Sequence, residues 1–312
     1  MQKTNWTKSD ASIIVLAPMD GYTDSAFRRI CKNVNSNIVV FTEFTSADGI
    51  HHSAKRLLQK LQFEQEEKPI VAQIFGKNTE TFVSAAQFCE KLGFDGIDLN
   101  MGCPSKKVVR SEHGVALRKN PEKAFQLVQA ITEATSLPVS VKTRLGWENA
   151  NDLVEFSQGV EAAGAQLITI HGRTYKQGFS DYADFEPLYQ LKKKLKIPIL
   201  ANGDILTIQD GMAKLKNLDG FMIGRASIGN PWCFSKKQIT NFADKTPLIK
   251  KHAEYLIQSK GEKAATLEIR KHLVAYVKNL PNAARFRAKL VRVESLAKIY
   301  DILNYITLQL TE

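Results

Sequence analysis

Eight short apolar segments, rich in β-branched residues, recur along the first three-quarters of this 312-residue chain and limit its possible folds most strongly. Helical patterns lie between most of them, including Thr79–Leu92, Pro121–Thr135, Asn151–Ala163 and Thr207–Leu218. Such alternation is typical of parallel β/α units, and eight units in about 250 residues match a closed (β/α)₈ barrel. A doubly wound open sheet is the alternative, although it usually has fewer strands. The predicted strands are Ile13–Ala17, Ile38–Phe41, Ile70–Ile74, Gly96–Asn100, Val139–Thr143, Leu167–His171, Ile197–Ala201 and Gly220–Ile223.

Strand patterns stop after about residue 240, and the remaining sequence is typical of helices. Apolar residues at Ile269, Leu273, Tyr276, Val277 and Leu280 have helical spacing. We therefore predict an α/β fold, with a (β/α)₈ TIM barrel over residues 1–240 and a small, all-helical C-terminal domain over residues 241–312.

Positive charge is concentrated in the predicted helical domain. The chain has a net charge of +11, and residues 245–312 contain 13 basic and 6 acidic residues, which leaves +7 there. On a helix that reaches back to Lys263, the side chains of Lys263, Arg270, Lys271 and Lys278 fall within roughly 100° of arc. This pattern favours a polyanionic partner, and a solvated helix face is the alternative.

Several other classes of protein are excluded by simple features. The longest apolar stretch, Ile13–Met19, is far shorter than the ~20 residues that cross a bilayer, and the N-terminus has no apolar signal segment. The four cysteines form no CxxC pair and have no metal-like spacing with histidine. We therefore expect a cytoplasmic protein with reduced thiols, no membrane partner and no metal.

Polar and cationic residues follow almost every predicted strand, where the catalytic residues of such barrels lie. The interval between the fourth and fifth strands is the longest and contains the polar loop GCPSKKVVRSEHG. So many polar strand ends indicate an active site. In chain order, the candidate residues at the strand ends, with the proline, methionine and glycines beside the polar ones, are Pro18, Met19, Asp20, Gln73, Asn100, Cys103, Lys142, Arg144, His171, Arg173, Asn202, Gly203, Asp204, Gly224 and Arg225.

The last two strand ends have the chemistry of an anion site. Glycine-containing loops expose backbone N–H groups, and the Arg225 guanidinium can bind phosphate oxygens. A phosphate here, with Gln73, Lys142 and His171 on the rim, suits flavin mononucleotide (FMN), since Lys142 can offset negative charge on a reduced flavin. An ion pair between Lys142 and Glu43 or another inward carboxylate is the alternative.

The residues that carry these features also carry a family resemblance. The sequence resembles the tRNA-dihydrouridine synthases over positions 16 to 287, in the segments LAPMDGYTDSAFR, FTEF, PIVAQIFG, GIDLNMGCPSKKVV, VSVKTRLGW, ITIHGRT, ILANGDI, FMIGRASIGNPWCF and RKHLVAYVKNLPNAARFR. The resemblance implies an FMN-bearing barrel, a helical tRNA-binding domain, and reduction of the 5,6 double bond of a tRNA uridine with NADPH as the usual electron source. NADH is left open as an electron donor.

The resemblance also assigns roles to individual residues. Cys103 matches the family's proton donor, and a thiol with a pKa of about 8.5 is mostly protonated at neutral pH. Hydride then passes from reduced FMN to C6 of the uracil, and Cys103 protonates C5. The FMN contacts are Pro18, Met19, Asp20, Gln73, Lys142, His171, Asn202, Gly203, Asp204, Gly224 and Arg225. As substrate contacts we expect Asn100, Arg144 and Arg173 from the rim, and Arg270 and Lys271 from the basic stripe.

Two residues depart from the family pattern, and two other functions stay open. Glu112 and Ala226 stand where glycine is common. Glu112 bears on the mobility of the loop after Cys103, and Ala226 permits a close backbone approach but narrows it. A small-molecule flavin reductase, such as a dihydroorotate dehydrogenase or an old-yellow-enzyme relative, would not need the basic tail. A non-catalytic RNA-binding barrel would need neither flavin nor Cys103.

Overall fold

The chain folds around a closed parallel β-barrel, as the alternating pattern predicts. The computed structural model describes residues 5–8 and 11–310, and nine strands of one sheet lie within these ranges. Eight of them close the barrel, because β2 pairs with β4 as well as with β1, and β1 pairs with β9. The strands are β1 (Ile13–Leu16), β2 (Val39–Phe41), β3 (Thr45–Ser46), β4 (Ile70–Phe75), β5 (Gly96–Met101), β6 (Val139–Arg144), β7 (Leu167–His171), β8 (Ile199–Asn202) and β9 (Gly220–Ile223).

The sequence locates these strands within two residues at each end. β7 and β9 have the predicted bounds, whereas β8 begins two residues later than Ile197. The sequence pattern did not predict β3, which pairs with the carboxyl end of β4 through only two residues. A two-residue strand is too short to produce a period-two pattern.

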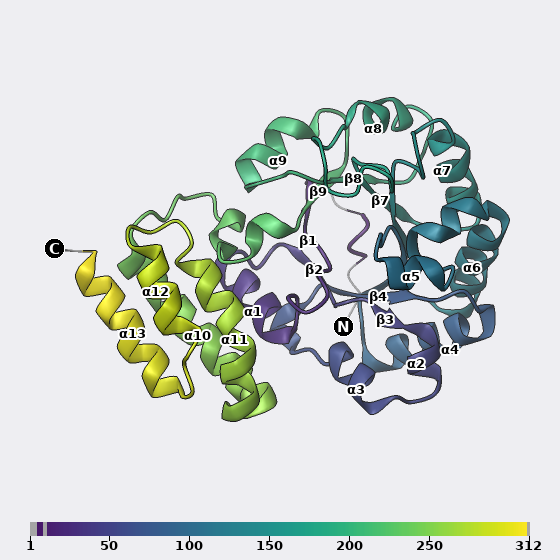
Figure 1. Ribbon diagram of the computed structural model, residues 1–312. Helices are drawn as coiled ribbons and strands as arrows, with labels where there is room; N and C mark the ends of the chain where they lie inside the picture. The colour runs from purple at the N-terminus through teal and green to yellow at the C-terminus, as the bar shows by residue number, and fades with distance from the viewer. Residues whose placement is uncertain (1–4, 9–10, 311–312) are drawn as a thin grey trace.

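A ring of helices surrounds the barrel, and shorter helices lie in its loops (Figure 1). Capping residues set several of their ends. For example, the Asn78 side chain accepts a hydrogen bond from the backbone N–H of Glu80, and Gly93 ends the same helix with a φ of 87°. The helices are α1 (Ser25–Val34), α2 (Ala47–His51), α3 (Lys55–Leu58), α4 (Thr79–Leu92), α5 (Lys106–Arg110), α6 (Pro121–Ala134), α7 (Leu153–Ala162), α8 (Glu186–Leu191) and α9 (Ile208–Leu215).

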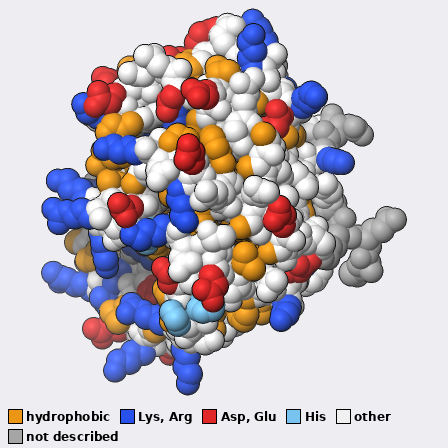
Figure 2. All heavy atoms as spheres, turned by 90° about the vertical axis from the view of Figure 1, so that its right-hand side faces the viewer, with side chains coloured by type: hydrophobic (Ala, Val, Ile, Leu, Met, Phe, Trp, Pro, Cys, Tyr) orange, Lys and Arg blue, Asp and Glu red, His pale blue; other side chains and the backbone are white. Residues whose placement is uncertain are grey.

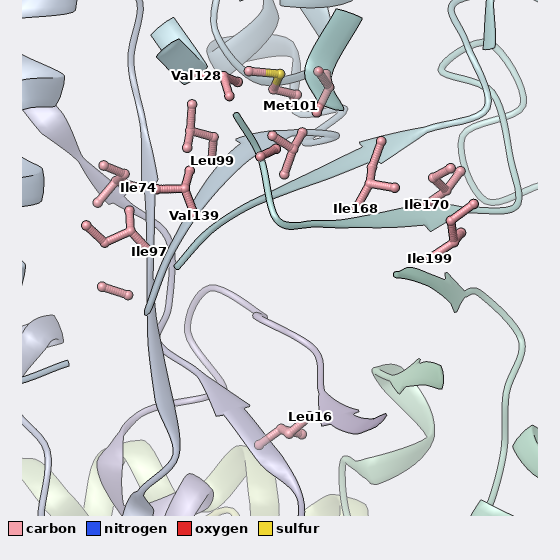
Figure 3. Packing of buried hydrophobic residues seen from close by; sticks show 14 of the residues in the cluster. Leu16, Ile74, Ile97, Leu99, Met101, Val128, Val139, Ile168, Ile170 and Ile199 are labelled. Atoms are coloured by element: carbon pink, nitrogen blue, oxygen red, sulfur yellow. The ribbon is translucent and has the colours of Figure 1, made fainter. Parts of the chain in front are cut away.

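Alternation along each strand separates the outer core from the barrel interior. On β5, Ile97, Leu99 and Met101 belong to the core under the helix ring, together with Val128 of α6 (Figure 3). The intervening residues of β5 therefore face the interior. A separate apolar cluster fills that interior and supports the polar strand ends; its members are Trp6, Ile13, Val15, Ala17, Val39, Phe41, Val71, Leu167, Leu200 and Met222.

Four helices follow the barrel and form a second core beside it (Figure 1), which confirms the predicted helical C-terminal region. They are α10 (Phe242–Lys260), α11 (Glu262–Tyr276), α12 (Ala283–Leu290) and α13 (Leu296–Gln309). Helix α1 joins the two cores, because Phe27 and Cys31 face the barrel core whereas Ala26 and Ile30 face the helical one. The predicted division after residue 240 falls next to Asn241, which caps α10, and residues 1–4, 9–10 and 311–312 of the two predicted domains lie outside the described residues.

The basic helix of the tail is shorter than its sequence pattern suggests. Helix α11 begins at Glu262, close to the predicted start, but it ends at Tyr276. Lys278 and Leu280 therefore lie in the turn that leads to α12. The predicted stripe of four cations does not occupy one helix. Among the described residues, no helix combines the length and apolar character needed to cross a membrane.

Candidate active site

A cavity of about 610 Å³ lies at the carboxyl ends of the barrel strands. Its volume is within the range of ~300–1,000 Å³ that is typical of ligand pockets. It is lined by 13 of the residues that the sequence pattern selected: Pro18, Met19, Gln73, Asn100, Cys103, Lys142, Arg144, His171, Asn202, Gly203, Asp204, Gly224 and Arg225. The structure therefore brings most of the predicted site together.

Hydrogen-bonded amides connect the floor of the cavity to the Cys103 loop. Gln73 donates from Nε2 to the Asp98 carboxylate over 2.7 Å, and Asn100 donates from Nδ2 to Gln73 Oε1 over 2.9 Å. Asn100 Oδ1 in turn accepts hydrogen bonds from the backbone N–H groups of Gly102, at 3.2 Å, and Cys103, at 2.9 Å. Asn100, which was predicted as a substrate contact, thus also orients the backbone of the Cys103 loop.

Cys103 is the cysteine that is open to this cavity, whereas Cys31, Cys89 and Cys233 are buried. Burial raises the pKa of the Cys103 thiol, and this effect outweighs a backbone hydrogen bond at Ser105 and the nearby charge of Arg144. The thiol therefore holds its proton at neutral pH, as a general acid must.

Lys142 is a buried cation at the centre of the site. Its Nζ donates to Asn202 Oδ1 over 2.9 Å, and burial lowers its pKa to about 8, with Arg144 adding to the shift and Asp98 opposing it. An ion pair between Lys142 and Glu43 is absent from the described residues. Glu43 instead accepts a hydrogen bond from the backbone N–H of Gly21 over 2.6 Å, and the inward carboxylate whose charge acts on Lys142 is Asp98.

Arg144 fastens the Cys103 loop to the next loop of the barrel. Its Nε donates to the carbonyl oxygen of Gly102 over 2.9 Å, and its Nη1 donates to the carbonyl oxygens of Thr174, at 2.9 Å, and Gly178, at 3.0 Å. Burial lowers its pKa to about 10, so the guanidinium stays charged. Arg144 thus lines the cavity while its fork is occupied by backbone carbonyls.

His171 is held neutral on the rim. Burial, followed by the charges of Lys142 and Arg144, lowers its pKa to about 2. Its Nε2 lies 3.4 Å from Nη1 of Arg173, and because a guanidinium only donates, Nε2 is the acceptor and the proton is assigned to Nδ1. A neutral imidazole here can bind a polar ligand without adding charge.

One end of the cavity has the features of an anion site. Gly203 has a φ of +116°, and a Cβ there would lie 2.8 Å from the Ala183 Cβ, so only glycine fits. Arg225 reaches this end with an exposed guanidinium 4.9 Å from the ring of Phe179, and it contacts the Asp204 carboxylate at 3.3 Å. The Arg225 guanidinium and the open backbone position at Gly203 suit a phosphate.

The residues of the whole cavity fit FMN by their chemistry. Arg225 and the glycine turns can hold the phosphate, and the buried Lys142 can face the electron-rich edge of the flavin ring. Gly224 leaves room, because a Cβ there would lie 3.4 Å from the nearest atom, in Ala17. Among the residues that the structure describes, no three His, Cys, Asp or Glu side chains gather as metal ligands do.

Four predicted site residues are not among those that line the cavity, and each has protein partners. Asp20 forms an ion pair with Lys60. Buried Arg173 donates to the Asp204 carboxylate and to two carbonyl groups of its own loop. Arg270 donates to the carbonyl oxygen of Val293 from Nε, at 3.1 Å, and from Nη2, at 2.7 Å, while Lys271 donates to the carbonyl oxygen of Gly21.

Other cavity residues were not selected for the site from the sequence. Phe44, Phe179 and Lys278 line the cavity, and Asp98 lies behind it. Lys278 was noted only as part of a basic stripe. The signal for Asp98 is the spacing GIDLN, because residues two apart on a strand share a face and Asp98 therefore faces inward with Asn100. Phe179 has no such signal, since it lies in an irregular loop.

This combination of a parallel (β/α)₈ barrel and a cationic cavity at its carboxyl rim defines the class of cofactor-binding TIM-barrel enzymes. The family model for dihydrouridine synthase matches residues 15–309, and the chain belongs to this family.

Proteins similar to this chain align with it over most of their lengths. The chain is 34% identical over 306 residues to a probable tRNA-dihydrouridine synthase 1 of Synechocystis, which covers 94% of this chain and 86% of that protein. It is 34% identical over 287 residues to tRNA-dihydrouridine synthase B of Pasteurella multocida, with coverages of 88% and 86%. An old yellow enzyme homologue from Zymomonas mobilis superimposes with a TM-score of 0.44 at 14% identity, over 72% of this chain and 87% of that chain.

Proposed function

We propose that this protein reduces the 5,6 double bond of specific uridines in tRNA to dihydrouridine, with FMN bound in the barrel cavity and NADPH as reductant. The observation that carries the proposal is the Cys103 thiol, whose pKa is raised by burial, on the rim of the same cavity that holds Lys142 and Arg225. The membership in the dihydrouridine synthase family and the names of the similar proteins support it.

FMN, when bound, supplies the hydride that is added to C6 of the uracil. The chain's own residues would bind and orient it: Arg225 and the backbone around Gly203 and Gly224 would hold the phosphate, and Lys142 would supply a positive charge to the flavin. Lys142 keeps that place because its Nζ is hydrogen-bonded to Asn202, which itself donates to the carbonyl oxygen of Met222 over 2.8 Å.

Cys103 completes the addition by donating its proton to C5 of the uracil. Hydride at C6 and a proton at C5 together add one H₂ across the double bond, and the thiolate that is left takes up a proton from solvent. Because Asn100 holds the backbone of Cys103 from one side and Arg144 holds that of Gly102 from the other, the thiol is presented in a fixed place.

The uridine reaches this cavity by leaving its stack in folded tRNA, which costs a few kcal/mol and is offset by contacts in the pocket and to the RNA backbone. The exposed ring of Phe179 offers a surface for stacking at the mouth of the cavity. Lys278 of the helical region lines the same cavity, so cations from both predicted domains surround the substrate's entrance.

Exposed cations elsewhere extend this surface. After the carboxyl ends of the strands lie exposed Lys106, Lys107 and Arg110 on α5, and exposed Lys77 and Lys176, which form ion pairs with Glu112 and Glu148. Figure 2 shows Lys and Arg side chains gathered along one edge of the barrel face that it presents. We propose that residues 1–240 form the catalytic domain and that residues 241–312, with exposed Arg285, Lys289 and Arg292, form the tRNA-binding domain.

The test is to incubate purified protein with FMN, NADPH and tRNA from cells that lack the gene, and to map dihydrouridine by mass spectrometry. We expect dihydrouridine at defined positions and oxidation of NADPH that depends on tRNA. A protein that binds FMN and oxidises NADPH with a small quinone or enone but leaves tRNA unchanged is a small-molecule reductase. A colourless protein that binds tRNA is the non-catalytic alternative.

A further inference from the structure

Asp98 lies inside the barrel in the middle of β5, and it is fully buried. The strand register places Gln73 of β4 on one side of it and Ser140 of β6 on the other. Gln73 Nε2 donates to its Oδ2 over 2.7 Å and Ser140 Oγ donates to its Oδ1 over 2.6 Å, so each neighbouring strand occupies one carboxylate oxygen.

The hydrogen bonds that lead away from Asp98 have a direction. A carboxylate only accepts, so Gln73 turns its amide nitrogen toward Asp98 and its oxygen toward Asn100. Asn100 then donates to Gln73 and keeps its own oxygen for the loop.

The loop end of the chain of hydrogen bonds requires the same direction. The backbone N–H groups of Gly102 and Cys103 only donate, and both point to Asn100 Oδ1. Two amide side chains, which are able to bind either way round, are thus fixed from both ends.

We propose that Asp98 is a positioning residue for the proton donor: through Gln73 and Asn100 it fixes the orientation of the amides that hold the backbone at Cys103. The inference rests on the proposed function for the role of the Cys103 thiol, whereas the hydrogen bonds themselves do not depend on it. Asp98 acts through other residues and is not among those that line the cavity.

The direction depends on an ionised Asp98, because a protonated carboxyl group could donate instead. Burial raises its pKa to about 6, while the hydrogen bonds from Ser140 and Gln73 and the charge of Lys142 oppose the shift. At neutral pH the carboxylate form therefore dominates.

The hydrogen bonds that link Asp98, Gln73 and Asn100 to the backbone at Cys103 are called the relay below. An exchange of donor and acceptor along the relay tests the proposal. Gln73→Glu places a second carboxylate against Asp98 and removes the donor between them. Adding Asp98→Asn restores complementarity, since the new asparagine donates to Glu at position 73, which still accepts from Asn100. Asp98→Asn alone keeps an acceptor but no longer imposes a direction.

The readout is the rate at which iodoacetamide alkylates Cys103, followed by mass spectrometry. We expect Gln73→Glu to speed alkylation about 10-fold, because a loosened loop exposes the thiol, and the double variant to react almost as slowly as wild type. In tRNA assays we expect Asp98→Asn to lower kcat roughly 10-fold with KM unchanged, because Asp98 itself is not among the residues that line the cavity.

Asp95→Asn is the matched control for loss of a buried acid. Asp95 accepts a hydrogen bond from the backbone N–H of Ile70 over 2.9 Å and pairs with Lys68, outside the relay. This variant should lower the free energy of unfolding without changing Cys103 alkylation.

Two results overturn the proposal: single substitutions whose effects on alkylation simply multiply in the double variant, or an Asp95→Asn effect as large as that of Gln73→Glu. Where the variants do not fold, amide hydrogen exchange of the wild-type protein decides, because the N–H groups of Gly102 and Cys103 must exchange more slowly than those of Lys106 and Lys107. If wild type forms no dihydrouridine while the double variant shows coupling, the proposed function fails and the relay stands.

Discussion

Basic side chains in the barrel cavity and basic side chains on α11 were both selected from the sequence, but the structure uses them differently. In the cavity, Lys142 is buried beside Asn202 and faces a space large enough for a ligand. On α11, Arg270 and Lys271 direct their charges to carbonyl groups of the protein itself. Strand alternation and strand ends specify where a side chain points, whereas a local charge excess does not say which cations are free to bind RNA.

On the cavity side of this comparison, we expect the largest effect from removal of the Cys103 thiol. Cys103→Ala should lower uridine reduction by roughly 10²–10⁴-fold, because proton transfer to carbon loses its acid. Flavin content and reduction by NADPH should stay as in wild type, because the thiol acts only on the uracil. Single-turnover assays with pre-reduced enzyme measure this.

Cys89→Ala, at a buried position on α4, is the control, and it should affect stability alone. Normal turnover of Cys103→Ala would show that another residue is the acid.

The junction between the helical region and the barrel should weaken in mild acid. His252 is buried against His272 and Tyr276, and burial lowers its pKa from 6.5 to about 4, with Asp24 opposing and Lys271 and Lys260 adding to the shift. Between pH 6.5 and pH 4, His252 therefore binds a proton in the unfolded chain but stays neutral in the folded chain. The contribution of His252 to the free energy of unfolding is fully present above pH 6.5. It falls as the pH drops toward 4, by up to about 3 kcal/mol.

Urea unfolding of wild type and His252→Gln between pH 4 and 7 measures the effect. The buried His272, whose pKa is also lowered by burial, acts in the same direction and stays in both proteins. The variant should lose part of the pH dependence over this window. An identical pH dependence in the two proteins would contradict the assignment to His252.

In the barrel cavity, Arg225→Glu should weaken FMN binding about 10- to 100-fold, because it replaces a charge-assisted hydrogen bond with repulsion. Flavin absorbance per protein and FMN titration of the stripped protein measure this. Arg110→Glu, an exposed cation on the same rim, is the matched control and should leave flavin content unchanged. Equal flavin content in Arg225→Glu and wild type would contradict the phosphate assignment.

Much of the barrel and its site follows from the sequence because the relevant signals are local. Each strand is marked by a short apolar run, and a closed parallel barrel brings the residues after those runs to one rim. Asn100, Cys103 and Lys142 were therefore found without any knowledge of long-range contacts. Phe179 and the direction of the Gln73 amide were not, because they depend on which loops and side chains meet across the barrel.

The helical region shows the opposite case. Its helical character follows from apolar spacing, but the partners of Arg270 and Lys271 lie in segments far away in the chain, at Val293 and Gly21. A helical wheel cannot include such contacts. Lys278 illustrates the same point, since it leaves the helix after Tyr276 and reaches the cavity.

The smallest expected effect separates exposed cations of the tail from a cation that is bound to a backbone carbonyl. Neutralising exposed Lys289 and Arg292 to glutamine should weaken tRNA binding alike for all tRNAs and reduce the salt slope by about 1 for each phosphate that is no longer neutralised. Arg270→Gln should instead lower the free energy of unfolding by about 1 kcal/mol, because it loses hydrogen bonds to Val293.

Affinity at several salt concentrations, together with urea unfolding, distinguishes the two pairs of outcomes. Phosphate contacts release condensed counterions, so a cation that binds RNA must change the salt slope, whereas a cation that binds a backbone carbonyl need not. If Arg270→Gln changes the salt slope as much as the double variant while its stability is unchanged, then Arg270 leaves Val293 when tRNA binds. In that case the stripe predicted from the sequence is part of the RNA-binding surface after all, and the contrast between the two regions holds only for the free protein.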